Sequence, residues 1–180
     1  MIYLFFATGT EEVEALATVD ILRRAGLPLQ IVSVTGEQVV TGAHQIRVVT
    51  DALIEDIDVD CADMLILPGG MPGATNFAAH PLLNTYLVQH VAADRPVAAI
   101  CAAPLVLGRL GLLRGKRATC YPGFENELVG ATCTGAMVEE DGLFVTGAGP
   151  AAAFDFAYAI VRRFRGAAVA EALAQGMLWQ

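Results

Sequence analysis

Short apolar runs alternate along the chain with longer segments whose apolar residues recur at helical spacing. The runs at residues 2–6, 29–34, 63–70 and 97–101 are apolar at nearly every position, which is typical of strands buried on both faces. The run at 63–70 ends in a glycine loop. Residues 117–121 are interpreted as a further strand.

The helical segments are delimited by residues that begin and end helices. The first has Thr10 as its expected N-cap, acidic residues in its first turn and Gly26 at its end. Pro150 is expected at the first position of a later helix that runs to about Arg165. The complete set of predicted helices is 11–26, 81–93, 103–113, 150–165 and 169–179.

Strands that alternate with helices predict an α/β fold, a doubly wound sandwich with a mostly parallel sheet and helices on both faces. Segments 38–50 and 136–146 have hairpin patterns, the first with its turn near Thr41-Gly42 and the second at an Asp-Gly pair. No repeat or linker divides the sequence, so we expect a single domain over residues 1–180. Its working site should lie beyond the carboxyl ends of the parallel strands.

Composition narrows the classes of protein. The chain is 55% hydrophobic and 17% charged, yet its apolar stretch 96–108 is shorter than the roughly 20 residues of a membrane span. The net charge of −8 argues against nucleic acid as the main partner. The amino-terminal segment lacks the pattern of a secretory signal, and the four cysteines form no CxxC pair. We therefore expect free thiols in a reducing, cytoplasmic compartment, and no metal site.

The segment AAICAAPLVL places Cys101 where a buried strand meets a helix. With Ala99 and Ala103 beside it, the pattern is small-x-nucleophile-x-small, which is typical of a sharp turn that presents a nucleophile. The following helix is expected to stabilise a thiolate, and the N–H group of Ala102 to help hold an oxyanion. The alternative is an ordinary buried cysteine at the end of a strand.

A base for this thiol is not evident among the histidines. His44, His80 and His90 all precede Cys101, and none follows it, so the order of residues does not support a Cys-His dyad. The first strand instead leads to three glutamates, Glu11, Glu12 and Glu14, which would also repel a phosphate. One of them is expected to meet the thiol and to carry a proton when the sulfur is a thiolate. The alternative is that all three are ordinary first-turn acids, which spacing favours for Glu11 and Glu12.

The loop LPGGMPGAT supplies candidate backbone donors. Gly69 and Gly70 can adopt backbone conformations that turn N–H groups toward an oxyanion. A simple tight turn is the alternative interpretation.

Taken in order, EEVEALATVDILRRAG, LILPGGMPGATN, AAICAAPLVL, DGLFVTGAGP and FDFAYAIVRRFRG resemble the ThiJ/PfpI superfamily, in its branch of DJ-one and YajL-like deglycases. The resemblance covers essentially the whole chain and implies a flavodoxin-like fold and a homodimer. It implies that Cys101 is the oxidation-prone elbow cysteine and that Glu14 is the protonated acid beside it. It also implies that Gly70 and Ala102 are the backbone donors.

Three positions depart from the family pattern. Tyr121 stands where many members place a histidine, and a phenol is a poor base at neutral pH. His44 and Ala148 stand where the human member has arginines that line its pocket. Any mechanism that relies on the histidine, and any strong binding of anions, is therefore not expected here.

The resemblance implies a cofactor-free, cysteine-dependent glyoxalase or deglycase that acts on methylglyoxal-type dicarbonyls or early glycation adducts in stress protection. A second hypothesis is a non-catalytic redox sensor or chaperone that is switched by oxidation of Cys101. Weak peptidase activity is a third, disfavoured by Tyr121. A role in thiamin synthesis finds no support, because no phosphate cradle is evident.

Overall fold

The centre of the computed structural model, which describes residues 1–179, is a seven-stranded sheet in the order β10-β11-β7-β6-β1-β2-β5. All neighbouring strands are parallel except the β10–β11 hairpin at one edge. The strands are β1 (Ile2–Phe6), β2 (Leu29–Ser33), β5 (Ala52–Leu53), β6 (Met64–Leu67), β7 (Val97–Ile100), β10 (Val138–Asp141) and β11 (Phe144–Gly147).

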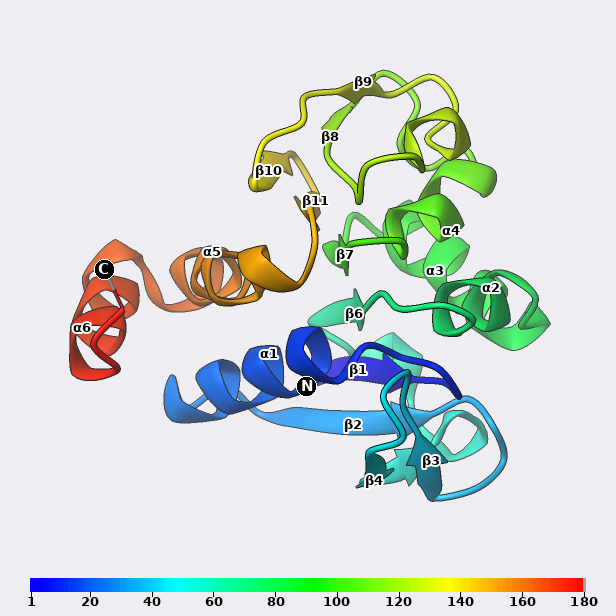
Figure 1. The fold of residues 1–180 in the computed structure, drawn as a ribbon, viewed down its shortest axis with the longest axis horizontal. Coiled ribbons are helices and arrows are strands. Elements are labelled where there is room, and N and C mark those ends of the chain that lie inside the picture. Colours follow the sequence, from blue (N-terminus) through cyan, green and yellow to red (C-terminus); the bar gives the residue numbers. More distant parts are fainter. Residues whose placement is uncertain (180) are drawn as a thin grey trace.

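Helices cover both faces of this sheet. Figure 1 shows α1, α5 and α6 on one side and α2, α3 and α4 on the other, and α1 packs extensively against α5. The helices are α1 (Glu12–Arg24), α2 (Gly73–Ala78), α3 (Pro81–Ala92), α4 (Pro104–Arg109), α5 (Ala153–Arg165) and α6 (Ala167–Gly176). Short 3₁₀ turns are η1 (Ile54–Asp56), η2 (Val59–Cys61), η3 (Glu125–Glu127) and η4 (Pro150–Ala152). The predicted doubly wound α/β sandwich is confirmed.

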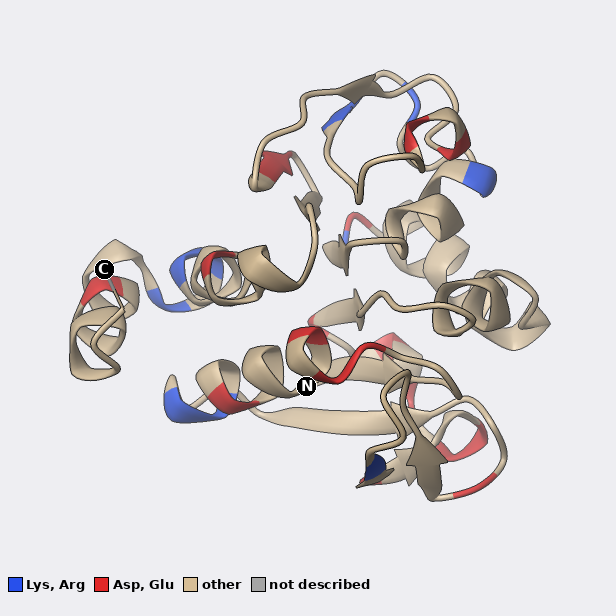
Figure 2. Ribbon diagram, in the orientation of Figure 1, with Lys and Arg blue, Asp and Glu red and all other residues tan. Residues whose placement is uncertain are grey.

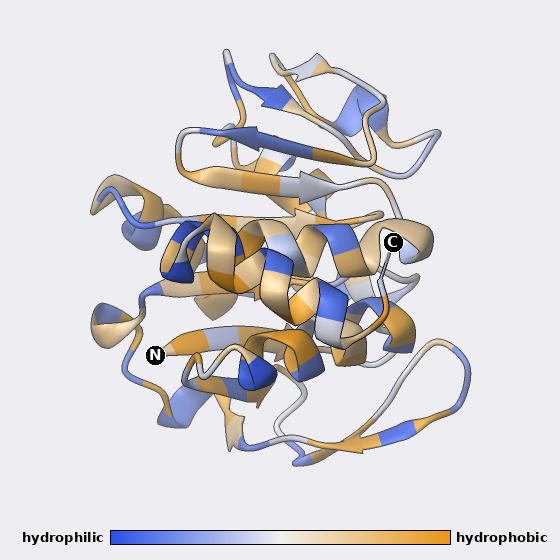
Figure 3. Cartoon of the chain, turned by 90° about the vertical axis from the view of Figure 1, so that its left-hand side faces the viewer, coloured by the Kyte–Doolittle hydropathy of each residue, from blue (hydrophilic) through white to orange (hydrophobic). Residues whose placement is uncertain are grey.

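The hydrophobic core follows directly from the uniformly apolar strands. Every residue of β1, β6 and β7 is buried, because helices cover the sheet on both faces. Figure 3 shows these strands as a mostly hydrophobic layer inside the molecule. Within residues 1–179, no helix combines the length and the apolar character that crossing a membrane requires.

Two small sheets lie outside the main one. The antiparallel pair β3 (Val39–Thr41) and β4 (Arg47–Val49) confirms the first predicted hairpin, and β10–β11 confirms the second. The pair β8 (Arg117–Ala118) and β9 (Thr132–Cys133) is parallel. The prediction of a strand over 117–121 is therefore wrong in extent, because the chain leaves β8 after two residues to approach the Cys101 turn.

Other predicted boundaries also need correction. The N-cap of α1 is Glu11, whose carboxylate accepts the N–H of Glu14, whereas the hydroxyl of Thr10 accepts the N–H of Ala7. The helix after Cys101 ends at Arg109, not at 113. Pro150 begins the 3₁₀ turn η4, and α5 starts only at Ala153.

The order of the parallel strands positions the site. From β1 the chain proceeds to β2 on one side, whereas β6, β7 and β11 lie on the other side. The loops that follow β1, β6 and β7 therefore converge at the carboxyl edge where the strand order reverses, which is where ligands bind in open α/β sheets. These loops contain Gly69, Gly70 and Cys101, and the loop after β1 leads into the first turn of α1, which carries Glu14.

Candidate active site

Cys101 occupies a strained turn directly after β7. Its φ of 65° lies in the left-handed region that non-glycine residues seldom adopt. Its N–H donates to the carbonyl of Gly147 and its carbonyl accepts the N–H of Tyr121, both at 2.8 Å. Ala99 and Ala103 on either side are fully buried, so larger side chains would not fit there. The turn holds the thiol at the end of the sheet, 8% exposed.

Glu14 reaches the same point from the first turn of α1 and is completely buried. Its Oε2 accepts the N–H of Gly69 at 2.8 Å. Its Oε1 is also buried and has no hydrogen-bond partner of good geometry within residues 1–179. The thiol of Cys101 is near enough to lower the pKa of Glu14. Glu14 therefore offers one anchored oxygen and one oxygen that is available to a nearby proton.

Glycine is required between these two side chains. A Cβ at Gly69 would lie 2.5 Å from the Cβ of Cys101 and 2.8 Å from Oε2 of Glu14. Gly70 has a φ of 90°, and a Cβ there would collide with the backbone of Glu11. The glycine loop after β6 thus permits the close approach of acid and thiol.

Two backbone donors point at the sulfur. The N–H groups of Gly70 and Ala102 both hydrogen-bond to Cys101 and lower its pKa. They come from different loops, one after β6 and one in the Cys101 turn itself. The structure thus brings together Cys101, Glu14, Gly70 and Ala102, with Gly69 between them.

Burial dominates the electrostatics of the pair. It raises the pKa of Glu14 to about 7, although the hydrogen bonds from Cys101 and Gly69 oppose the rise. Burial, followed by the charge of Glu14, raises the pKa of Cys101 to about 12. The expectation that the helix stabilises a thiolate does not hold for the resting thiol, because burial and the neighbouring Glu14 outweigh the two backbone donors that lower its pKa. Above about pH 7 the pair retains one proton, and the higher pKa of Cys101 keeps that proton on the sulfur at rest.

Tyr121 and Ala148 lie at the edge of the site, and neither side chain is charged. The backbone of Tyr121 is bonded to Cys101, and its half-exposed ring lies against Gly149, where a Cβ would stand 3.1 Å from Cδ2. The N–H of Ala148 donates to the carbonyl of Met137. Figure 2 shows acidic residues where α1 begins and no charged residue in the segment that connects β11 to the start of α5.

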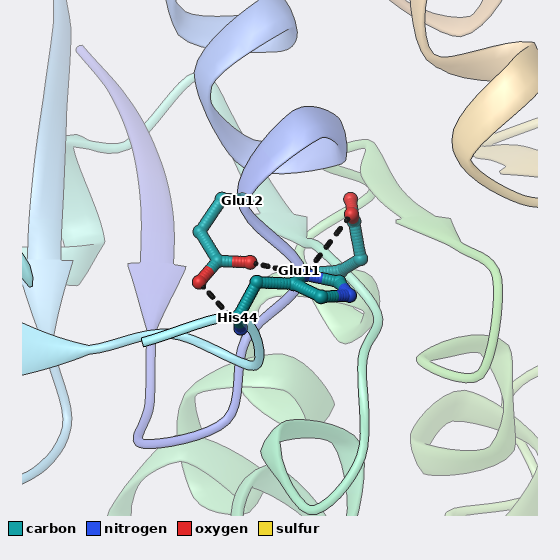
Figure 4. A group of neighbouring side chains, drawn as sticks. All are labelled: Glu11, Glu12 and His44. Atoms are coloured by element: carbon teal, nitrogen blue, oxygen red, sulfur yellow. Dashed lines mark hydrogen bonds and ion pairs between the residues drawn. The ribbon is translucent and has the colours of Figure 1, made fainter. Parts of the chain in front are cut away.

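His44 pairs with carboxylates other than that of Glu14. Figure 4 shows its ring against Glu12, with Nδ1 2.8 Å from Oε2, and it lies 3.8 Å from Glu11. Glu12 also accepts the N–H groups of His44 and Ile46. Burial tends to raise the pKa of Glu12, but these bonds outweigh it and lower that pKa.

Glu11, Glu12 and His44 form a cluster in which both carboxylates are buried. The two glutamates are therefore not ordinary first-turn acids exposed to solvent. The bonds of Glu12 tie the β3–β4 loop to the start of α1. Glu11, Glu12 and His44 form the one group within residues 1–179 with ligand atoms spaced for a metal ion. The oxygens of Glu12 already accept three hydrogen bonds, so the group is interpreted as a structural tie.

Sequence reasoning did not find this tie, because its partners are 32 residues apart. A signal for Glu14 was present, however. Thr18 and Ile21 are buried on α1 at spacings of four and seven residues from Glu14, so its carboxylate lies on the face of the helix that is turned to the core.

The order of the mostly parallel sheet and the helices on both of its faces define a flavodoxin-like domain, and its candidate site is a buried thiol in a strained strand-to-helix turn with a carboxyl group and two backbone donors beside it. The chain matches the family model "DJ-1/PfpI family" over residues 1–163. It belongs to that family, which confirms the resemblance inferred from the sequence.

Relatives with assigned names support the same class. The chain is 39% identical over 162 residues to Protein DJ-1 homolog B of Arabidopsis thaliana, covering 89% of this chain and 37% of that protein. It thus spans less than half the length of that curated relative. It is 32% identical to Glutathione-independent glyoxalase DJR-1.2 of Caenorhabditis elegans, covering 87% and 83% of the two chains. The solved structure of oxidized Toxoplasma gondii DJ-1 superposes with a TM-score of 0.95 at 32% identity, covering 99% and 97% of the two chains.

Proposed function

We propose that this protein is a cofactor-free glyoxalase that converts methylglyoxal-type dicarbonyls into 2-hydroxy acids, with Cys101 as nucleophile and Glu14 as acid and base. The observation that carries the proposal is the fully buried carboxyl of Glu14, which lies with the thiol against Gly69 and has a pKa of about 7. A group that titrates near neutral pH can both accept and return a proton. The glyoxalase named among the relatives supports the same chemistry.

In the first step the sulfur of Cys101 attacks the aldehyde carbon, and the thiol proton passes to the Glu14 carboxylate. The carbonyl oxygen becomes an oxyanion beside the N–H groups of Gly70 and Ala102, which already hydrogen-bond to the sulfur. Because burial raises the pKa of the thiol to about 12, free thiolate is scarce. The proton transfer to Glu14 accompanies the attack and does not precede it.

In the second step Glu14 first returns its proton to the oxyanion and becomes a carboxylate again. It then removes the proton of the hemithioacetal carbon and delivers it to the neighbouring carbonyl carbon. The hydroxyl proton on the first carbon passes to the oxygen of the second, and the product is a thioester of the 2-hydroxy acid on Cys101. Water then releases the acid and restores the thiol, so that methylglyoxal and water give lactate with no external oxidant. Release of early glycation adducts by the same thiol is the deglycase extension of this activity.

Lactate formation from methylglyoxal by the purified protein tests the proposal. Glu14→Gln should lower kcat by about 10²- to 10⁴-fold, because it removes the proton carrier and keeps the shape of the side chain. A fully active Glu14→Gln protein would overturn the scheme. The Glu12→Gln variant, altered at a buried acid that faces away toward His44, serves as the matched control.

A redox sensor is the second candidate, favoured by the solved relative that is described as oxidized. Peroxide would convert the Cys101 thiol to sulfinic acid, and a protonated Glu14 would hydrogen-bond to the product. Mass spectrometry after graded peroxide treatment should then find Cys101 modified before the exposed Cys133. Earlier oxidation of Cys120 or Cys133 would count against this candidate.

We further propose a cytoplasmic homodimer. Exposed apolar side chains on α1 and on the β3–β4 hairpin, such as Val13, Leu16, Ile46 and Val49, support self-association. The four cysteines are free thiols, which fits a reducing compartment.

A further inference from the structure

An uncharged pocket of about 300 Å³ lies between Tyr121 and the segment that follows β11. Its walls are formed by Tyr121, Met137 and the segment 148–152. Every side chain that lines it is apolar, apart from the phenol of Tyr121. A ligand group that enters this pocket therefore meets no formal charge.

Backbone hydrogen bonds connect the residues around this pocket to the Cys101 turn. Tyr121 donates its N–H to the carbonyl of Cys101 at 2.8 Å, and Cys101 donates its N–H to the carbonyl of Gly147, the residue before the 148–152 wall. The two segments that form the walls therefore flank the turn that carries the thiol.

The lining suits a flat, apolar group. Tyr121 and Met137 are each about half exposed, so both present free surface. Gly149 has no Cβ to block the Tyr121 ring. Methionine adapts its shape to a ligand and makes favourable contacts with aromatic rings.

We propose that this pocket receives the substituent of the dicarbonyl substrate, so that the site selects 2-oxoaldehydes with an apolar or aromatic substituent over those with an anionic one. The inference rests on the proposed function, because it assigns a substrate class to the same thiol. A phenyl substituent removes more apolar surface from water than a methyl group, while a carboxylate would lose its hydration with no cation to receive it.

Turnover of three substrates tests the preference. The kcat/KM for phenylglyoxal should exceed that for methylglyoxal by about tenfold or more, and 4,5-dioxopentanoate should be the poorest substrate. Ala148→Arg should reverse the order of the phenyl and the carboxylate substrates. The control Ala168→Arg adds the same charge at an exposed position on α6 and should leave the order unchanged.

Alkylation of Cys101 tests the pocket without turnover. The measured quantity is the alkylation ratio, the rate with phenacyl bromide divided by the rate with iodoacetate. This ratio should be higher at Cys101 than at the free thiol of N-acetylcysteine. Ala148→Arg should lower it. Selective alkylation without lactate formation would reject the proposed function and keep the pocket. A different result would overturn the proposed role of the pocket and keep the proposed function. In that case lactate would form with no preference for the phenyl substrate. The alkylation ratio would equal that of N-acetylcysteine, and Ala148→Arg would not change it.

Discussion

Cys101 and Cys120 are two thiols in nearly the same degree of burial, 8% and 6% exposed. Burial is the largest cause that raises the pKa of each to about 12. Cys101, however, has the carboxyl of Glu14 and the N–H groups of Gly70 and Ala102 around it. Cys120 has near it the exposed Cys133 and Glu125, which raise its pKa further.

The comparison teaches that a buried thiol needs an acceptor for its proton, because burial by itself suppresses the reactive thiolate. At Cys120 the neighbouring carboxyl is that of the exposed Glu125, and within residues 1–179 no buried carboxyl lies beside this sulfur to receive its proton. At Cys101 a carboxyl with a pKa of about 7 stands beside the sulfur. The two regions therefore differ in whether a carboxyl group beside the sulfur can accept the thiol proton. They do not differ in how deeply the sulfur is buried.

The largest expected effect concerns the pH dependence of stability at Glu14. Its pKa is about 7 in the folded protein and near 4.5 in the unfolded chain, so the folded state holds the extra proton between these values. Its contribution to the free energy of unfolding therefore falls by about 3 kcal/mol as the pH rises from 4.5 to 7. Glu14→Gln should abolish that fall, whereas Glu125→Gln beside Cys120 should not.

Denaturant unfolding of the wild type and both variants across this pH range measures the effect. Buried His90 acts with the opposite sign, because burial lowers its pKa to about 4 and its contribution to stability is lost as the pH falls from 6.5 to 4. Only the difference between wild type and Glu14→Gln isolates Glu14. A difference that does not change with pH would contradict the raised pKa.

An intermediate effect is expected from the backbone of the two regions. A Cβ at Gly69 would overlap Cys101 and Glu14, whereas Gly135, in the loop near Cys133, has open space around it and a φ of 68°. Gly69→Ala should therefore lower the free energy of unfolding by about 2–3 kcal/mol, and Gly135→Ala by about 1 kcal/mol from backbone strain. Equal losses in chemical denaturation would show that Gly69 does not separate the pair.

The smallest effect concerns the thiols themselves. Replacing Glu14 by Gln removes the charge that raises the pKa of Cys101, so the thiolate fraction at pH 8 should rise by about tenfold or more. Iodoacetamide labelling, followed peptide by peptide, should show faster labelling of Cys101 and an unchanged rate at Cys120. An unchanged rate at Cys101 would mean that Glu14 does not act on its thiol.

Much of the fold could be predicted because the strands are buried on both faces and their apolar runs are unambiguous. The errors lie where tertiary contacts override local signals. Helix α2 follows a glycine loop with no strong start signal, and the chain leaves β8 early because the N–H of Tyr121 bonds to Cys101. Neither the start of α2 nor the end of β8 can be predicted from the residues nearby in the sequence.

The candidate site divides in the same way. The small residues around Cys101 already indicated the sharp turn, since that geometry leaves a local signature. Helical spacing placed Glu14 on the face of α1 that is turned to the core, but it could not show which carboxylate meets the thiol, because that depends on the contacts each one makes in the folded protein. Glu11 caps the helix, Glu12 holds the His44 loop, and only Glu14 points to the sulfur.

The most direct test of the account compares Cys101→Ala with Cys120→Ala in lactate formation from methylglyoxal, at equal concentrations of folded protein. We expect turnover to fall below detection in Cys101→Ala and to stay within about twofold of wild type in Cys120→Ala. Substantial turnover in Cys101→Ala, or its loss in Cys120→Ala alone, would contradict the claim that the thiol paired with Glu14 performs the chemistry.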